Sequence, residues 1–313
     1  MSSPGRGTAS VDISVTLGPL HLKNPVVTAS GTFGYGTEFA DFFDLARLGG
    51  LVVKGLSPEP RQGHAPPRIC ETAAGLVNAI GLHNVGVEAF IAEKLPPLRG
   101  IDTAIIANVY GETVDEYVTV CRRLDSAGGV SAVELNASCP NTAKGGMHFG
   151  VDPSALGRLV EASRQATQLP LIVKLSPNVT DIRVPARAAV DAGADILSLV
   201  NTFTALCIDA ETRRPVLSNR IGGLSGPAIK PLALHLVHEV AGAVDVPIMG
   251  MGGITSAVDA VEFMLAGAGA IQVGTANFVD PCRSADLVDE LTAWCAAHDV
   301  RRVAELVGGL AES

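Results

Sequence analysis

Residues 171–201, LIVKLSPNVTDIRVPARAAVDAGADILSLVN, hold the pattern that decides the fold. The stretch opens with a short apolar segment (171–175), continues with apolar residues at helical spacing (184–192) and closes with a second apolar segment (196–201). Strands buried on both faces are continuous apolar runs, and parallel neighbours need a crossover, usually a helix, between them. The stretch therefore predicts a strand–helix–strand unit of a parallel sheet.

The same unit recurs along the chain. Eight apolar segments lie at 25–29, 51–55, 104–109, 132–136, 171–175, 196–201, 247–250 and 270–274. Helical patterns separate most of them, at 113–127, 153–167, 184–192, 228–241, 256–266 and 283–298. Eight such units predict an α/β fold of the (β/α)8 TIM-barrel type. A doubly wound open sheet is the alternative, but the G-x-G-x-x-G fingerprint is missing after the first strand, where 30–36 read SGTFGYG.

The barrel pattern also predicts how the rest of the chain is organised. Alternation around Gly18-Pro19 predicts a β-hairpin over 11–25, before the first barrel strand. We expect 11–313 to form a single barrel domain and 1–10 to be a flexible tail. Extended loops are expected at 138–151, after strand four, and at 202–227, after strand six. In this fold the loops after the strands build the active site.

Composition and charge exclude several classes of protein. A net charge of −9 leaves no basic face for nucleic acid. No apolar run approaches the roughly 20 residues of a membrane span, and residues 1–10 lack the apolar core of a signal peptide, so we expect a soluble, cytoplasmic protein. The six cysteines form no C-x-x-C pair, which argues against a disulfide framework or an iron–sulfur site.

Polar residues gather where the predicted strands end. They are Lys54, Asn108, Asn136, Lys174 and Asn201. A lysine or asparagine within an apolar strand is costly to bury without a partner. One of them could cap a neighbouring loop, but five at the same mouth of the barrel indicate a ligand site.

Glycine-rich turns follow the last two predicted strands. They read GMGGIT at 250–255 and GTA at 274–276. In barrels of this type these two loops present backbone N–H groups to a phosphate. Lys174 suits a site where negative charge develops, and the N1/O2 edge of a reduced flavin is one such partner. Together these features favour a phosphate-bearing cofactor.

Cys139 stands in the most informative stretch, ELNASCPN at 134–141. A free cysteine is usually a small buried apolar residue, which is our interpretation of Cys70, Cys121, Cys207, Cys282 and Cys295. Cys139 instead lies on a strand-end loop beside Pro140, and a thiol with an ordinary pKa of about 8.5 can act as a base if its thiolate is stabilised. Cys139 is therefore the candidate base.

Other charged clusters are interpreted as solvated surface. His235, His238 and Glu239 share a predicted outer helix but lack the order of a zinc-protease motif. Asp286, Asp289 and Glu290 lie on the last predicted helix. We expect no metal site.

The strand-end motifs of this chain resemble those of a known family, the class 1 dihydroorotate dehydrogenases. The resemblance rests on ELNASCPN with Lys144-Gly145-Gly146 and extends over nearly the whole barrel. Further matching segments are ASGTFGYG (29–36), Lys54-Gly55 with Glu59-Pro60-Arg61, NAIGLHN (78–84), Asn201-Thr202-Phe203, GGLSGPAIKP (222–231), Gly252-Gly253-Ile254 and VGTAN (273–277). It implies FMN-dependent oxidation of (S)-dihydroorotate to orotate in de novo pyrimidine (UMP) biosynthesis. Cys139 would remove the C5 proton while hydride leaves C6 for flavin N5. Class 2 enzymes carry serine at this position and an N-terminal extension.

The resemblance also implies the binding residues. Those for the substrate would be Lys54, Asn78, Ala79, Ile80, Gly81, Leu82, Asn136, Asn201 and Thr202. Those for FMN would be Ser30, Lys54, Gly55, Asn108, Asn136, Lys174, Val200, Gly226, Gly252, Gly253, Gly274 and Thr275. The chain departs from the family at Ala137, Thr142 and Cys207, none of which bears one of these roles.

Within class 1, the segments at 30–36, 78–84 and 222–231 are similar to the NAD-linked type B. This implies a homodimer that assembles with an FAD- and [2Fe–2S]-bearing electron-transfer subunit into a heterotetramer. The alternatives are a fumarate-dependent type A enzyme, an enzyme like dihydropyrimidine dehydrogenase, and an FMN-binding subunit without turnover of its own. A phosphate-binding barrel aldolase or isomerase is more distant.

Overall fold

Eight parallel strands form a closed barrel in the computed structural model, which describes residues 11–137 and 149–311. Their order around the barrel is the order in the chain. The barrel strands are β3 (Val26–Thr28), β4 (Gly50–Val52), β7 (Ala104–Val109), β8 (Ala132–Asn136), β9 (Leu171–Lys174), β10 (Ile196–Leu199), β15 (Ile248–Met251) and β16 (Ala270–Val273). A doubly wound sheet would reverse its strand order and keep two free edges. The predicted barrel is confirmed.

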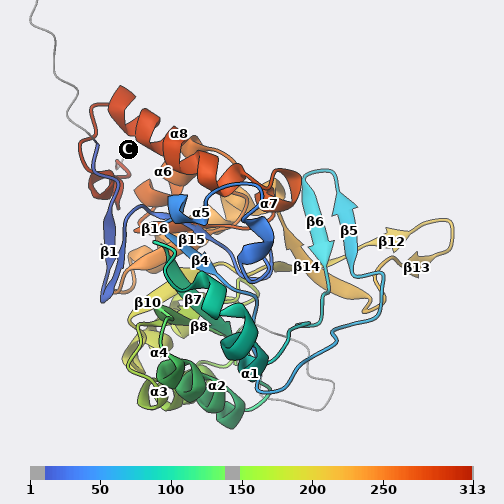
Figure 1. The fold of residues 1–313 in the computed structure, drawn as a ribbon. Helices are drawn as coiled ribbons and strands as arrows, with labels where there is room; N and C mark the ends of the chain where they lie inside the picture. Colours follow the sequence, from blue (N-terminus) through green and yellow to red (C-terminus); the bar gives the residue numbers. More distant parts are fainter. Residues whose placement is uncertain (1–10, 138–148, 312–313) are drawn as a thin grey trace, which may run out of the picture.

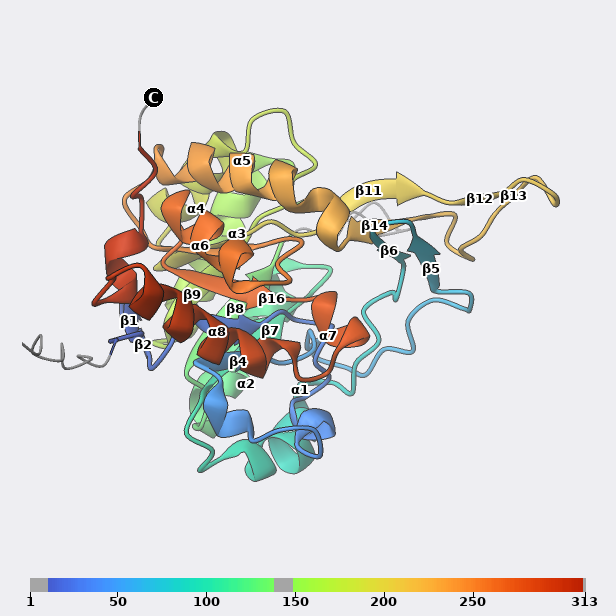
Figure 2. The same cartoon turned by 90° about the horizontal axis from the view of Figure 1, so that it is seen from above.

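Helices surround the barrel, as Figures 1 and 2 show from two directions. They are α1 (Val87–Ala89), α2 (Val114–Ala127), α3 (Pro153–Ala166), α4 (Arg183–Asp191), α5 (Lys230–Ala241), α6 (Ala257–Leu265), α7 (Ala276–Val279) and α8 (Arg283–Ala297). Helix α2 illustrates how the sequence forms them: the Thr113 hydroxyl accepts a hydrogen bond from the Glu116 N–H at its start, and one apolar face with Tyr117 and Leu124 is buried. The six helical patterns predicted from sequence match α2–α6 and α8.

The N-terminal hairpin closes one end of the barrel. Strands β1 (Val15–Leu17) and β2 (Leu20–Leu22) pair antiparallel, as predicted. Their buried side chains share one apolar cluster with barrel residues such as Val27 and Ile172. In both views the hairpin lies at the end of the barrel opposite to β5 and β6. The other end is therefore the one left for a site.

An antiparallel sheet rises over that other end. Its strand order is β11 (Phe203–Leu206), β14 (Ile221–Ser225), β6 (Gly75–Asn78), β5 (Ile69–Thr72). A two-stranded extension, β12 (Ile208–Asp209) with β13 (Arg214–Pro215), projects from the body as an arm in Figures 1 and 2. The long connection predicted after the sixth strand exists, but it is built of strands, and its pairing with 69–78 was not predicted.

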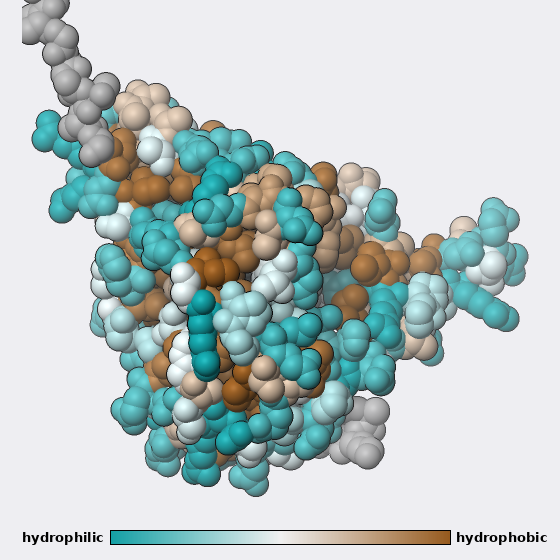
Figure 3. All heavy atoms as spheres, in the orientation of Figure 1, coloured by the Kyte–Doolittle hydropathy of each residue, from teal (hydrophilic) through white to brown (hydrophobic). Residues whose placement is uncertain are grey.

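The surface of the arm changes character along its length. Figure 3 shows apolar atoms where the arm leaves the body and hydrophilic atoms toward its tip. Leu206, Ile208 and Ile221 are the large exposed apolar residues of this region.

In the part of the chain that the structure describes, no helix has both the length and the apolar character needed to cross a membrane.

Candidate active site

A cavity of about 1320 Å³ opens at the carboxyl ends of the barrel strands, beneath the four-stranded sheet. Every described residue predicted to bind a ligand lines it. They are Ser30, Lys54, Gly55, Asn78, Ala79, Ile80, Gly81, Leu82, Asn108, Asn136, Lys174, Val200, Asn201, Thr202, Gly226, Gly252, Gly253, Gly274 and Thr275. Single small-ligand pockets commonly measure roughly 300–1,000 Å³. The cavity therefore has room for a cofactor and a small substrate together.

A polar network lies at the floor of the cavity, in the centre of the barrel. The Glu134 carboxylate is fully buried and accepts hydrogen bonds from Asn108 Nδ2 (2.7 Å), Ser198 Oγ (2.9 Å) and Gln272 Nε2 (2.7 Å). These donors come from β7, β10 and β16, so the carboxylate ties together three strands besides its own β8. Such a carboxylate is stable inside a protein only when it is hydrogen-bonded in this way.

Sequence reasoning did not select Glu134, Ser198 or Gln272. The signal was available, because each is a polar residue inside an apolar strand, the same rule that selected Lys174 and Asn108.

Lys174 stands next to this network. Its Nζ donates a hydrogen bond to Ser30 Oγ at 3.2 Å, and the residue is only 4% exposed. Burial lowers the pKa of Lys174, and the nearby Glu134 carboxylate opposes that shift. When it is protonated, the lysine places a positive charge in a dry part of the cavity, where such a charge acts strongly on a ligand.

Two residues that line the cavity each keep one buried oxygen without a partner. Asn108 Oδ1 and Gln272 Oε1 have no hydrogen-bond partner among the described residues. Buried acceptors of this kind are rare in folded proteins. Gly55 allows the backbone to pack close to Asn108, since a Cβ there would stand 2.9 Å from Oδ1.

The glycine turns after β15 and β16 form an anion cradle. Within residues 11–137 and 149–311, none of the backbone N–H groups of Gly253, Ile254, Gly274 and Thr275 donates a hydrogen bond to protein. Gly253 has a φ of 76°, and a Cβ on it would lie 2.8 Å from the carbonyl oxygen of Gly226. Only glycine fits there. Free N–H groups on adjoining loops are the arrangement that binds phosphate.

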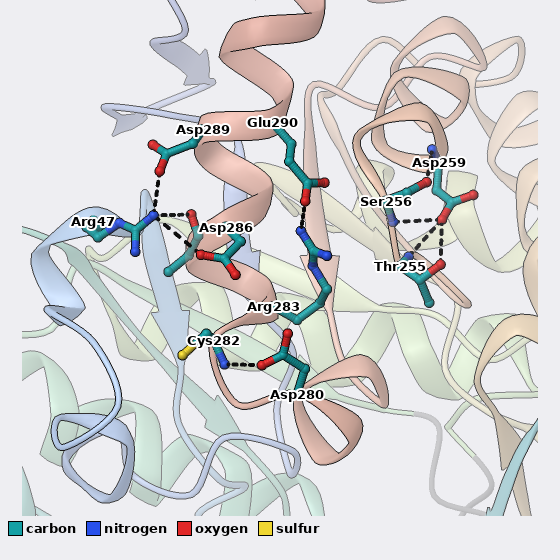
Figure 4. A network of polar contacts seen from close by, with 11 residues as sticks. Arg47, Thr255, Ser256, Asp259, Asp280, Cys282, Arg283, Asp286, Asp289 and Glu290 are labelled. Carbon is teal, nitrogen blue, oxygen red and sulfur yellow. Dashed lines mark hydrogen bonds and ion pairs between the residues drawn. The ribbon is translucent and has the colours of Figure 1, made fainter.

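Asp259 holds the first of these turns in place, as Figure 4 shows. Its carboxylate accepts from the N–H groups of Thr255 (2.8 Å) and Ser256 (2.9 Å) and pairs with Lys230 (2.6 Å). The Ser256 hydroxyl in turn accepts from the Asp259 N–H, which completes a capping box at the start of α6. The turn is therefore held in place by contacts within the protein.

Amide groups and Lys54 also line the cavity. Asn201 Nδ2 donates to Asn136 Oδ1 at 3.3 Å, and Asn78 Nδ2 donates to the Gly223 carbonyl at 3.3 Å. Lys54 is half-buried; burial lowers its pKa, and the Arg68 guanidinium lowers it further. A compact ligand with N–H, C=O and carboxylate groups would meet matching partners here.

Cys139 lies outside the described residues, within the segment 138–148 that follows Ala137. Two of the other cysteines fit the interpretation as buried apolar residues. Cys121 and Cys295 are fully buried, and burial raises the pKa of the Cys121 thiol to about 12. Cys70, Cys207 and Cys282 are half-buried.

The charged clusters set aside from sequence lie away from the cavity. His235 and His238 are exposed on α5. The carboxylates of α8 pair with arginines: Arg47 with Asp289 (2.7 Å) and Asp286 (3.7 Å), and Arg283 with Glu290 (Figure 4). Among the residues with a described structure, no group of three or more His, Cys, Asp or Glu side chains could hold a metal ion.

The fold and the cavity define the class of protein: a (β/α)8 barrel with two glycine turns and a polar, lysine-bearing cavity at its carboxyl mouth. A sequence model described as dihydroorotate dehydrogenase matches residues 12–294. The chain belongs to the dihydroorotate dehydrogenase family.

Individual relatives agree with this assignment. The chain is 56% identical over 299 residues to the "Dihydroorotate dehydrogenase B (NAD(+)), catalytic subunit" of Pelobacter propionicus, covering 96% of this chain and 98% of that protein. It is 52% identical to the protein of the same name in Geobacter sulfurreducens, with the same coverage. Among solved structures, a dihydroorotate dehydrogenase from Eimeria tenella in complex with ferulenol superposes with a TM-score of 0.80 at 22% identity, over 95% of this chain and 88% of that one. The similarity to the Eimeria tenella structure supports the barrel fold.

Proposed function

We propose that this protein oxidises (S)-dihydroorotate to orotate with bound FMN, as the catalytic subunit of an NAD-linked dihydroorotate dehydrogenase. The observation that carries the proposal is one cavity lined by glycine turns with free N–H groups, by amide side chains and by Lys174. The reaction belongs to de novo pyrimidine synthesis.

The cavity residues fit FMN. Its phosphate suits the free N–H groups of the turns at Gly253 and Gly274. Lys174 suits the negative charge that the flavin ring gains on reduction, and Asn108 and Gln272 line the same cavity. When bound, FMN supplies the acceptor for the hydride that leaves C6 of the substrate.

The remaining groups suit dihydroorotate. Its ring carries alternating N–H and C=O groups, which match the amides of Asn78, Asn136 and Asn201. Lys54 supplies a positive charge for the carboxylate. These contacts orient the substrate so that its C5 and C6 hydrogens face the two groups that remove them.

Cys139 is the proposed base. It would take the C5 proton onto its sulfur as the C5=C6 double bond forms. Cys139→Ala should abolish turnover while FMN stays bound. Cys139→Ser should leave little activity near neutral pH, because a serine hydroxyl is a far weaker acid than a thiol. Near-normal rates for Cys139→Ala would show that another group is the base.

A partner subunit is the proposed route for the electrons. The relatives are named as catalytic subunits of NAD(+)-linked enzymes. We propose that the chain forms a homodimer and joins an FAD- and [2Fe–2S]-bearing subunit in a heterotetramer, in the cytoplasm. The partner would hold the cofactors that receive electrons from FMN and reduce NAD.

Anaerobic reduction of the purified chain tests the proposal. A protein that binds FMN should be yellow and should bleach when dihydroorotate is added. Cys139→Ala should stay yellow under the same conditions, and dihydrouracil, which lacks the carboxylate, should bleach wild type poorly. A yellow wild-type protein that dihydroorotate does not bleach would instead be an FMN-binding subunit without turnover.

A further inference from the structure

Cys70 and Cys207 lie together although they are far apart in the chain. Cys70 belongs to β5 and Cys207 follows β11, the two outer strands of the four-stranded sheet. Both side chains pack against the same small apolar cluster, formed by Val77, Ala79 and Leu217. The sheet therefore curls enough to bring its two edges together.

The pair occupies the face of the sheet that turns away from the ligand cavity. On β5, Ile69 and Glu71 line the cavity and Cys70 between them does not. On β6, Leu76 and Asn78 line it, whereas Val77 belongs to the cluster behind. Because neighbouring strand residues point to opposite faces, the thiols sit directly behind one wall of the site.

Backbone hydrogen bonds hold the two edges near each other. The Val216 N–H donates to the Cys207 carbonyl (2.9 Å), and the Ser218 N–H donates to the Pro67 carbonyl (3.0 Å). The segment 216–218 thus links the Cys207 region to the chain that leads into β5. Burial, and then the neighbouring Cys70 thiol, raise the pKa of Cys207, in agreement with the shared apolar cluster.

We propose that Cys70 and Cys207 form an oxidation site, in which a peroxide joins them in an intramolecular disulfide. Both residues are half-buried, so a small oxidant can reach them. The Cys70 thiolate attacks one peroxide oxygen, the O–O bond breaks, and a sulfenic acid and hydroxide form. The Cys207 sulfur then attacks the sulfenic sulfur, and water leaves as the S–S bond forms. Two thiols lose two electrons in total, and one hydrogen peroxide becomes two waters.

The disulfide would tie together the outer strands of the wall that carries Asn78. It would also anchor the base of the arm, since β12 begins directly after Cys207. A cross-link between distant positions narrows the unfolded ensemble more than a short one does, so oxidation should raise the melting temperature by several degrees. Formation of this disulfide does not depend on which electron acceptor the protein uses.

Peptide mapping of the peroxide-treated protein tests the proposal. The reduced wild-type chain, treated with hydrogen peroxide and then alkylated, should yield a peptide pair linked through Cys70 and Cys207 that lacks two hydrogens and disappears with dithiothreitol. Cys70→Ser and Cys207→Ser should each lose the linked pair and the rise in melting temperature. The matched control Cys282→Ser, at another half-buried cysteine, should keep both.

Other outcomes would overturn it. Wild-type protein in which Cys70 and Cys207 gain oxygen separately, stay reduced, or link to other cysteines does not hold the proposed site. These outcomes are measured on the wild-type protein, so they can be interpreted even if a serine variant folds poorly.

Discussion

Glu134 and Lys174 set the charge at the floor of the cavity. The carboxylate is fully buried among three hydrogen-bond donors, and the lysine beside it is nearly so. The two charges are close enough to influence each other, since burial lowers the pKa of Lys174 and Glu134 opposes that shift. The negative charge of Glu134 also weakens the field that Lys174 exerts on a ligand. The two residues should therefore act on a bound flavin in opposite directions.

Glu134→Gln should make a bound flavin easier to reduce. Without the carboxylate, the positive potential of Lys174 is no longer offset, so the midpoint potential of the flavin should become more positive. A tenfold change in the two-electron reduction equilibrium corresponds to on the order of 30 mV. Dye equilibration measures it. Ser198→Ala is the control, since it removes one hydrogen bond to Glu134 and keeps the charge. An unchanged or more negative potential in Glu134→Gln would contradict the assigned field.

Lys174→Ala should weaken FMN binding or slow its reduction. The substitution removes a buried positive charge and a hydrogen bond to Ser30, and losing a charge-assisted contact commonly costs about tenfold or more in affinity. Titration of the apoprotein with FMN and stopped-flow reduction by dihydroorotate measure the two quantities. If both match wild type, Lys174 has no part in the cofactor site.

Lys54 predicts how product binding depends on pH. Its pKa is lowered by burial and by Arg68, so it loses its charge at a lower pH than an ordinary lysine. Orotate binding should therefore weaken as pH rises through that lowered pKa, at a lower pH than an ordinary lysine would give. Titration with orotate across this range measures the trend. In Lys54→Arg the guanidinium stays charged and the dependence should flatten; an equally steep profile would assign the pH effect to another group.

At the scale of elements, the barrel was predictable because each of its strands and helices carries its own periodic signal. Segments such as 104–109 are apolar throughout, and α2 begins at a capping threonine. The four-stranded sheet lacks such a signal. Strand β14 reads IGGLS, which has low intrinsic strand preference, and it forms through pairing with β6 far back in the sequence.

The turn held by Asp259 offers a test at this scale. Asp259→Asn removes the charge that anchors Thr255, Ser256 and Lys230, and should lower the free energy of unfolding by about 1 kcal/mol. Because the same turn presents the N–H groups at 253–254, FMN affinity should fall as well.

Thr113→Ala is the matched control, since it removes a cap of α2 that does not line the cavity. It should cost similar stability in chemical denaturation and leave FMN affinity unchanged. Equal FMN affinity in both variants would mean that Asp259 stabilises α6 only.

The depressed pKa of Asp259 gives this stabilisation a defined pH range. Burial alone would raise the pKa, but hydrogen bonds from Lys230, Thr255 and Ser256 outweigh it and lower the value. A carboxylate with a lowered pKa contributes stability that is complete above its unfolded value, near 3.8, and is lost as pH falls through the folded value. The difference in stability between wild type and Asp259→Asn should therefore shrink in acid.

At the scale of the molecule, the net charge of −9 and an anionic substrate are compatible because the cavity sets its own potential. Lys54 and Lys174 face into it, while several of the acidic side chains pair on outer helices, as on α8 in Figure 4. The described residues that were predicted to bind ligands meet in this cavity, because strand ends of a parallel barrel converge. Glu134, Ser198 and Gln272 could have been selected as polar residues inside apolar strands, but their mutual distances and the free N–H groups depend on the folded chain and could not be predicted in that way.

The electron acceptor is a property of the assembly and gives the last prediction. A catalytic subunit that relies on a partner for its acceptor should be reduced by dihydroorotate on its own but should not turn over with NAD. Addition of an iron–sulfur flavoprotein that copurifies with the chain should restore NADH formation, measured by absorbance, whereas fumarate should support little turnover under either condition. The Cys139→Ala chain with the same partner is the control, because it should assemble and stay inactive. Efficient fumarate reduction by the chain alone would place it with the fumarate-dependent type of the family, since that reaction needs no second protein.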